Sequence, residues 1–126
     1  IRDRYMTIVN SVGGCLFGAF LGAKRIRFFD WINAATGWDF TPNQYMDKAA
    51  DIHTLKQAFN VKHGLEPKNI KISERALGRP VQKEGANKGR SVEIEAMMSR
   101  YWEQFGWDGD TGKPSDAHVE RIAAGA

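Results

Sequence analysis

Residues 41–59 read TPNQYMDKAADIHTLKQAF, and this stretch decides the fold class. Apolar side chains recur in it at spacings of three and four residues, which is the pattern of an amphipathic α-helix. The stripe consists of Tyr45, Ala49, Ile52, Leu55 and Phe59, widened by Met46 and Ala50. We therefore predict a helix over residues 42–59 that buries one face.

The start of this helix is marked by residue types that favour a helix N-terminus. Thr41 can cap the helix, and Pro42 suits its first position because proline has no N–H to leave unpaired. Gln44 completes a T-x-x-Q capping box with Thr41. Gly64 can then end the helix at its C-terminus.

Two further helices are predicted in the C-terminal half. The first covers residues 92–105 and ends at Gly106. We interpret its apolar face as core packing and not as a cofactor site. That face consists of Ile94, Met97, Met98, Tyr101, Trp102 and Phe105. The second helix is short, with Ser115 as its N-cap. Its apolar side consists of Val119, Ile122 and Ala123.

The N-terminal third predicts helical stretches over residues 4–9, 16–21 and 26–35, the last of which stops at Gly37. A Gly-Gly pair interrupts the chain between the first two. The segments at residues 16–21 and 26–35 carry apolar residues on all sides, so we expect them to be buried against more than one neighbour.

Residues 65–90 are predicted to form a long connector on the surface, because prolines and glycines recur there at short intervals. No alternation of the kind that forms strands, and no internal repeat, occurs in the sequence. The patterns together predict an all-α protein, an irregular multi-helix orthogonal bundle. We expect one domain over residues 1–126.

The formal net charge of +3 is modest, and most of the excess lies between residues 62 and 90. The cations there are Lys62, Lys68, Lys71, Arg75, Arg79, Lys83, Lys88 and Arg90, against Glu66, Glu74 and Glu84. No aromatic residue interleaves with these charges, so a solvated connector is favoured over a nucleic-acid surface. Binding of an acidic protein to this basic segment stays an open alternative.

The ends and the apolar runs of the sequence indicate where the protein works. The chain opens at Ile1 without a signal-peptide pattern, and we expect it to be the C-terminal piece of a longer protein. The longest apolar run, residues 12–23, is shorter than the ~20 residues that span a bilayer, so no membrane segment is expected. A single cysteine forms no internal disulfide, which indicates a reducing, cytoplasmic setting.

One constellation can carry chemistry, at residues 10–15, which read NSVGGC. Its glycines let the backbone approach a bulky ligand, and a thiolate of Cys15 could bind iron. From the residues alone, a small buried hydrophobe is the more common role of such a cysteine. The three histidines share no metal-ligand spacing, and we expect His53 to be a half-buried packing residue. No complete catalytic motif is present, so no catalytic residue is assigned.

Four blocks resemble the tungsten-containing aldehyde ferredoxin oxidoreductase family. Residues 33–42, NAATGWDFTP, are similar to the family's NAATGWDLTPEE, and residues 59–64, FNVKHG, to its FNVREG. Residues 97–108 resemble ML-x-x-YY-x-x-RGWD, and residues 112–114, GKP, resemble the closing G-x-P. The blocks keep their order and spacing over nearly the whole chain.

The resemblance implies a [4Fe-4S] cluster and a tungsten bis-molybdopterin in the full-length enzyme. Three cluster cysteines of the family lie upstream in a C-x-x-C-x-x-x-C motif, and the fourth lies in D-x-x-G-L-C, whose spacing residues 10–15 match. Cys15 would thus be the fourth cluster ligand, and Asn10, Gly13 and Gly14 would contribute to the pterin pocket. The isolated chain is expected to bind neither cofactor, since one thiolate cannot replace four.

Two residues depart from the family motif. Asn10 stands where the family has Asp, and an amide oxygen accepts hydrogen bonds from a pterin more weakly than a carboxylate does. Gly14 replaces Leu, and we expect this change to remove a packing side chain and to loosen the turn that presents the thiol.

By resemblance the whole enzyme would oxidise aldehydes to carboxylic acids and pass electrons to ferredoxin, with this chain as its C-terminal domain. Its partners would be the upstream domains, ferredoxin and the aldehyde, without nucleic acid or membrane. The alternative is a stand-alone helical interaction module whose basic connector binds an acidic protein, with Cys15 merely buried.

Overall fold

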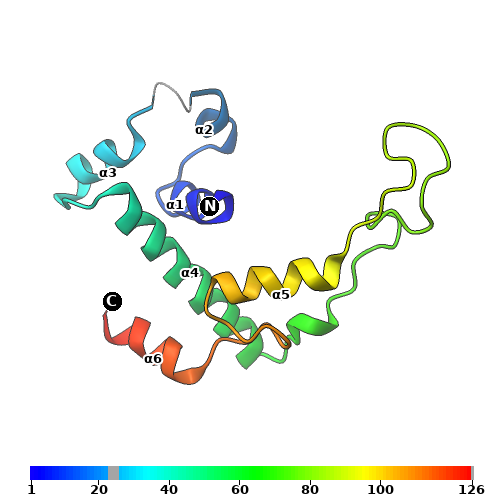
Figure 1. The fold of residues 1–126 in the computed structure, drawn as a ribbon. Helices are drawn as coiled ribbons and strands as arrows, with labels where there is room; N and C mark the ends of the chain where they lie inside the picture. The colour runs from blue at the N-terminus through cyan, green and yellow to red at the C-terminus, as the bar shows by residue number, and fades with distance from the viewer. Residues whose placement is uncertain (23–25, 126) are drawn as a thin grey trace. The chain divides into compact units, whose positions relative to one another are not determined.

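The computed structural model describes residues 1–22 and 26–125, and within them the secondary structure is helical (Figure 1). The helices are α1 (Arg2–Ser11), α2 (Leu16–Gly22), α3 (Phe28–Thr36), α4 (Pro42–Lys62), the 3₁₀-helix η1 (Pro67–Asn69), α5 (Ile94–Gln104) and α6 (Asp116–Ala124). The only β pairing among the described residues is an isolated bridge between Gln82 and Lys88. The predicted all-α, multi-helix fold is confirmed. No helix in the described ranges is long and apolar enough to cross a membrane.

The chain forms two compact units, Ile1–Lys56 and Gln57–Ala126, which are described separately below. The single domain expected over residues 1–126 stays a prediction. The predicted helices all exist, with ends that differ by at most three residues: α4 extends to Lys62, and α5 covers Ile94–Gln104 instead of residues 92–105. Shifts of this size are ordinary, since helix ends are set by local hydrogen bonds that a periodic pattern does not specify.

The core of the first unit is formed by side chains from α1, α3 and α4. Ile8, Ile32, Tyr45 and Ala49 are buried together. Partly buried aromatic residues pack against them, among them Phe29, whose ring stacks on that of Tyr45 with centroids 5.2 Å apart. The apolar stripe predicted for α4 is therefore real in its first half. Its second half is not buried, because Leu55 and Phe59 are 38% and 61% exposed.

The caps predicted from sequence are present. The backbone N–H of Gln44 donates to Thr41 Oγ1 at 3.3 Å, and the N–H of Thr41 donates to Gln44 Oε1 at 2.8 Å, which is the reciprocal capping box. Ser115 Oγ accepts from the N–H of His118 at 3.3 Å at the start of α6. Each cap satisfies N–H groups that the first turn of a helix leaves without a carbonyl partner.

The family-like block at residues 33–42 connects α3 to α4 through one amide side chain. Asn33 Nδ2 donates to the carbonyl oxygen of Phe40 at 2.9 Å, and Asn33 Oδ1 accepts from the Phe40 N–H at 3.3 Å. The same Oδ1 accepts from the hydroxyl of Tyr45 at 2.5 Å. Gly37 ends α3 with a φ of +75°. The block therefore fixes the geometry of a helix–helix turn.

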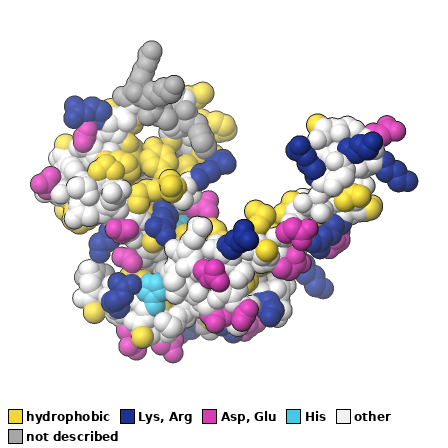
Figure 2. Space-filling model, viewed as in Figure 1, with side chains coloured by type: hydrophobic (Ala, Val, Ile, Leu, Met, Phe, Trp, Pro, Cys, Tyr) yellow, Lys and Arg dark blue, Asp and Glu magenta, His cyan; other side chains and the backbone are white. Residues whose placement is uncertain are grey.

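In the second unit, the connector over residues 65–90 has the irregular structure that the sequence predicts. It contains only η1, turns and the Gln82–Lys88 bridge, and nearly all its residues are exposed. Leu77 is an exception, at 5% exposure. Figure 2 shows Lys and Arg side chains on this segment, with hydrophobic side chains also exposed among them, such as Ile70 at 53% and Val81 at 49%.

The core of the second unit lies between α5, α6 and the turn that joins them. Trp102, Phe105, Trp107 and Ile122 are buried, and the rings of Phe105 and Trp107 stack with centroids 4.9 Å apart. The apolar face predicted for α5 is thus packing, except for Met97, which is 58% exposed.

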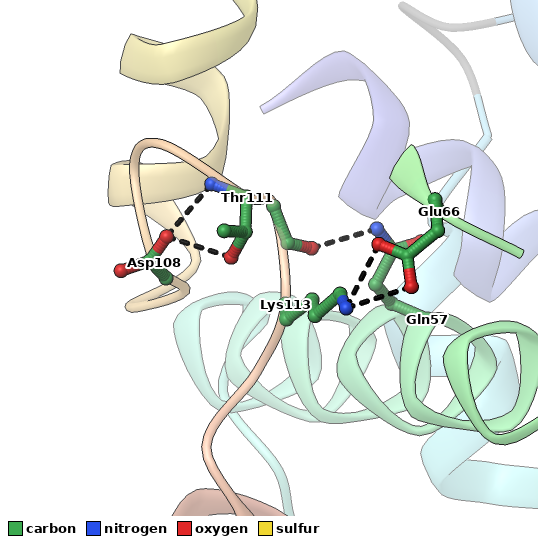
Figure 3. A network of polar contacts seen from close by, with 6 residues as sticks. Gln57, Glu66, Asp108, Thr111 and Lys113 are labelled. Carbon is green, nitrogen blue, oxygen red and sulfur yellow. Dashed lines mark hydrogen bonds and ion pairs between the residues drawn. The ribbon is translucent and has the colours of Figure 1, made fainter. Parts of the chain in front are cut away.

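The turn after α5 is tied to the end of α4 by polar contacts (Figure 3). Gln57 Nε2 donates to the carbonyl oxygen of Gly112 at 2.8 Å, and Lys113 Nζ pairs with Glu66 at 2.8 Å. A β-carbon on Gly112 would lie 2.5 Å from the Trp102 ring. The glycine of the closing G-x-P block is therefore required by close packing.

Candidate functional site

The candidate site lies at the tight turn that joins α1 to α2. The N–H of Gly13 donates to the Asn10 carbonyl at 3.2 Å, and the N–H of Gly14 donates to the Val9 carbonyl at 2.7 Å. Gly13 has a φ of +73°, which favours glycine. These bonds close the turn within a few residues, and Cys15 lines the same pocket as Val9 of α1.

Gly14 is packed against Val9, and the expectation that this glycine loosens the turn is wrong. A β-carbon at position 14 would lie 2.9 Å from the Val9 carbonyl oxygen and 2.8 Å from Val9 Cγ1. Both distances are shorter than van der Waals contact, so the absence of a side chain is what lets the turn close. With no side chain at position 14, the backbone of the turn lies close to Val9.

Cys15 carries a free, exposed thiol. Its carbonyl oxygen accepts from the Ala19 N–H at 2.9 Å, which places Cys15 directly before α2. The alternative in which Cys15 is merely a buried hydrophobe is therefore wrong for this chain. An exposed thiol is accessible to iron, to oxidants and to alkylating reagents, whereas a buried one is not.

Cys15 borders the largest pocket described in the first unit, with a volume of about 470 Å³. The lining is almost entirely apolar and comes from α1, the turn, α2 and α3. It consists of Tyr5, Val9, Val12, Gly14, Cys15, Gly18, Ala19, Ile26, Phe28, Trp31, Ile32, Ala35 and Thr36. Of the residues predicted for the site, Gly14 and Cys15 line this pocket, whereas Asn10 and Gly13 are exposed beside it.

The surface around the pocket is also apolar. Phe17 is 72% exposed, Leu21 89% and Trp31 59%. The expected burial is therefore wrong within this chain for Leu16, Phe17, Leu21 and Trp31, and the side chain of Phe20 lies outside the described residues. Figure 2 shows hydrophobic side chains gathered on this unit.

Sequence reasoning missed most of the pocket walls. Trp31 and Ala35 line it from one face of α3, and their spacing of four residues is the available signal. Tyr5 and Val9 line it from α1 at the same spacing. Nothing in the sequence says that these two faces meet, because their meeting depends on the turn at residues 10–15.

Two titratable side chains outside the turn, His53 and Asp108, have structural roles. His53 is half-buried, as expected, and its Nε2 lies 2.7 Å from Thr7 Oγ1. The pKa of Asp108 is lowered by the hydroxyl and then by the backbone N–H of Thr111, both of which donate to its carboxylate at 2.7 Å. Among the described residues, no group of three or more His, Cys, Asp and Glu side chains could hold a metal ion.

Comparison with known proteins agrees with the motif blocks. A family model described as aldehyde ferredoxin oxidoreductase, domains 2 and 3, matches residues 1–123. The tungsten-containing aldehyde ferredoxin oxidoreductase of Pyrococcus furiosus is 39% identical over 111 residues, which cover 86% of this chain and 18% of that protein. The enzyme of the same name from Thermococcus kodakarensis is 38% identical over 115 residues, which cover 90% of this chain and 18% of that protein.

The chain spans less than a fifth of the length of these curated relatives, at 18% of each. The family match nevertheless covers almost all of the chain, including the turn at residues 10–15 and the block at residues 33–42. The chain therefore belongs to the aldehyde ferredoxin oxidoreductase family and corresponds to part of its domains 2 and 3.

Proposed function

We propose that this chain is the C-terminal helical part of a cytoplasmic tungstopterin and [4Fe-4S] enzyme that oxidises aldehydes to carboxylic acids. The overall reaction adds the oxygen of water to the aldehyde carbon and releases two protons and two electrons, which ferredoxin would accept. The observation that carries the proposal is the exposed thiol of Cys15, held at the edge of an apolar pocket at the spacing of the family motif.

The donor set of the turn fits one corner of an iron-sulfur cluster. Cluster iron takes thiolate ligands, and Cys15 is the one thiol of the chain. It is exposed, and the pocket beside it offers no carboxylate or imidazole that would compete for the metal. The remaining cluster ligands would come from upstream domains of the same protein.

When bound, the pterin-held metal would supply the two-electron oxidation and the cluster would carry electrons onward. The residues of this chain would hold and insulate these groups. Cys15 would ligate one iron, and the apolar walls beside it would exclude water from the cluster. Asn10, Gly13 and Gly14 would form part of the pterin pocket, with the Asn10 amide as a hydrogen-bond acceptor. None of them is assigned a catalytic role.

The exposed apolar surface around α2 supports the proposal that upstream domains pack there. Large apolar side chains such as Phe17 and Leu21 rarely form a contiguous exposed surface unless it is an interaction site. Coverage by another domain would also remove Cys15 from bulk water, which protects a cluster from oxidants.

The decisive experiment is Cys15→Ser in the full-length protein. A hard oxygen donor suits cluster iron less well than thiolate, so the cluster should be lost or shifted in potential while the helical core persists. Iron content, the electron paramagnetic resonance signal and ferredoxin reduction are the measurements. Val12→Ala, which trims the same pocket without touching a donor, is the matched control and should keep all three.

If Cys15→Ser leaves cluster content, the resonance signal and ferredoxin reduction unchanged, Cys15 is not a ligand. Asn10→Asp makes a complementary test, because a carboxylate should strengthen a pterin hydrogen bond by charge assistance. Retention of the pterin during dialysis should then improve.

A further inference from the structure

A second candidate site lies in the connector of the second unit, where residues 78–91 form a closed loop. The N–H of Val92 donates to the Leu77 carbonyl at 2.9 Å and joins the two ends. Gly78 has a φ of +71°, and a β-carbon there would lie 2.6 Å from the Arg90 carbonyl oxygen. The two ends of the loop therefore lie close together at a neck, formed by Leu77, Gly78 and residues 90–92, where position 78 has room only for glycine.

Main-chain hydrogen bonds also build the interior of the loop. The N–H of Gly89 donates to the Gln82 carbonyl at 3.0 Å, and the N–H of Arg90 donates to the Asn87 carbonyl at 3.1 Å. The turn before the neck is closed in the same way, since the N–H of Arg79 donates to the Glu74 carbonyl at 2.8 Å. These bonds give the loop a defined shape although it lacks helix and strand.

This loop and the turn before it enclose a pocket of about 330 Å³. Its lining consists of Arg75, Ala76, Leu77, Gly78, Gln82, Asn87, Arg90, Ser91 and Val92. The lining residues include two arginines, two residues with carboxamide side chains and one serine, and none of them is acidic. A pocket of this size is at the lower end of the range for small-molecule sites.

The hydrogen-bond donors of this pocket are available to a ligand. Arg79, which does not line it, pairs with Glu95 at 3.6 Å and donates to the Val92 carbonyl at 3.4 Å. Within the described part of the chain, by contrast, the side chains of Arg75 and Arg90 form no ion pair or hydrogen bond. Among the described residues, both guanidinium groups are thus without a protein partner.

We propose that this pocket binds a phosphate group, either as inorganic phosphate or as the phosphoryl group of a small organic molecule. Guanidinium groups bind oxyanions through two parallel hydrogen bonds each. Two of them, with amide and hydroxyl donors beside them, offer more donors than the two oxygens of a carboxylate can use, whereas a phosphate group has three or four. Lys88 on the same loop adds to the positive potential. The proposal is independent of the cluster and of Cys15.

The test is calorimetric titration of the full-length, cofactor-loaded protein at constant ionic strength. The probes are inorganic phosphate, ribose 5-phosphate and malonate, a dicarboxylate. Saturable binding of at least one phosphate compound, tighter than malonate, is expected. Ribose 5-phosphate binding much more tightly than inorganic phosphate would identify the phosphoryl group of an organic molecule as the ligand, and equal affinities would identify free phosphate.

Variants separate a built site from diffuse charge. Arg75→Gln and Arg90→Gln should each raise the Kd about tenfold or more, because each removes charge-assisted hydrogen bonds. Arg90→Lys keeps the positive charge but loses the paired N–H donors of the guanidinium group, and it should weaken binding less than Arg90→Gln does. Lys83→Gln removes the same charge from the same loop outside the pocket lining and should change Kd less than about twofold.

Three results would overturn the proposal. They are no saturable phosphate binding, tighter binding of malonate than of either phosphate compound, and equal effects of Lys83→Gln and Arg90→Gln. Thermal unfolding of each variant is the folding control, and these exposed side chains should leave the midpoint unchanged.

Discussion

The carbonyl oxygen of Val9 accepts a 2.7 Å hydrogen bond from the backbone N–H of Gly14, and this bond sets the direction in which the chain enters Cys15. It closes the turn over the last residues of α1, where a side chain at position 14 would collide with Val9. The position of the thiol therefore depends on two residues that would not themselves ligate a metal.

Gly14→Leu, which installs the residue type of the family motif, should destabilise this protein. The new side chain must displace Val9 or open the turn, and overpacking of this kind costs about 1–3 kcal/mol. Gly13→Ala is the matched control, since no atom lies within 4 Å of its β-carbon position and only the left-handed φ is penalised. Denaturant unfolding compares the two, and equal stability of Gly14→Leu and the parent protein would contradict the tight-turn interpretation.

Gly112→Ala should be among the most damaging single-methyl additions in the second unit. The methyl group would lie 2.5 Å from the Trp102 ring and would also face a positive φ of 70°, so a loss of about 2–4 kcal/mol is expected. Gly85→Ala has a similar φ of 87° with open space around it, and should cost only about 1 kcal/mol. Thermal unfolding followed by tryptophan fluorescence measures both, and similar losses for the two variants would refute the packing argument.

Thr111→Val should raise the pKa of Asp108 towards its ordinary value of 3.8, because it removes the hydroxyl that contributes most to lowering it. A carboxyl group whose folded pKa is lowered contributes stability above its unfolded pKa and loses it as pH falls through the folded pKa. The acid limb of the stability curve should therefore flatten below pH 3.8 in the variant. Carboxyl NMR titration measures the shift directly. A substitution of the neighbouring Asp110 by Asn should leave the Asp108 titration nearly unchanged.

The isolated chain of 126 residues should bind no iron-sulfur cluster, because a [4Fe-4S] centre normally takes four thiolates and this chain has one cysteine. Anaerobic reconstitution followed by iron analysis tests this expectation. Cys15 should instead react as a free thiol with alkylating reagents, since it is exposed. Stoichiometric iron on a monomer would show that the chain supplies other ligands.

The features that the sequence predicted correctly are local ones. The Thr41–Gln44 capping box and the Ser115 cap depend on residues three apart, so their spacing is enough to reveal them. The period of three and four predicted α4 for the same reason. Such patterns are read along one segment without knowledge of its neighbours.

The features that the sequence did not reveal depend on distant residues. The exposure of Phe17 and Leu21 reflects what lies over α2, which an apolar pattern cannot specify. The two arginines of the phosphate-sized pocket lie 15 positions apart in sequence, and the neck at Gly78 brings them to one pocket.

The side-chain amide of Asn33 bonds to the main chain of Phe40 and not to its side chain. This difference between the two residues determines which of them can be substituted. A backbone group is supplied by any residue, so position 40 is free to exchange one apolar side chain for another, and the corresponding position of the family block holds Leu. Position 33 has no such freedom, because Asn alone offers a donor and an acceptor at this reach. As this segment evolves, the side chain at position 40 would therefore change many times, whereas Asn33 would persist.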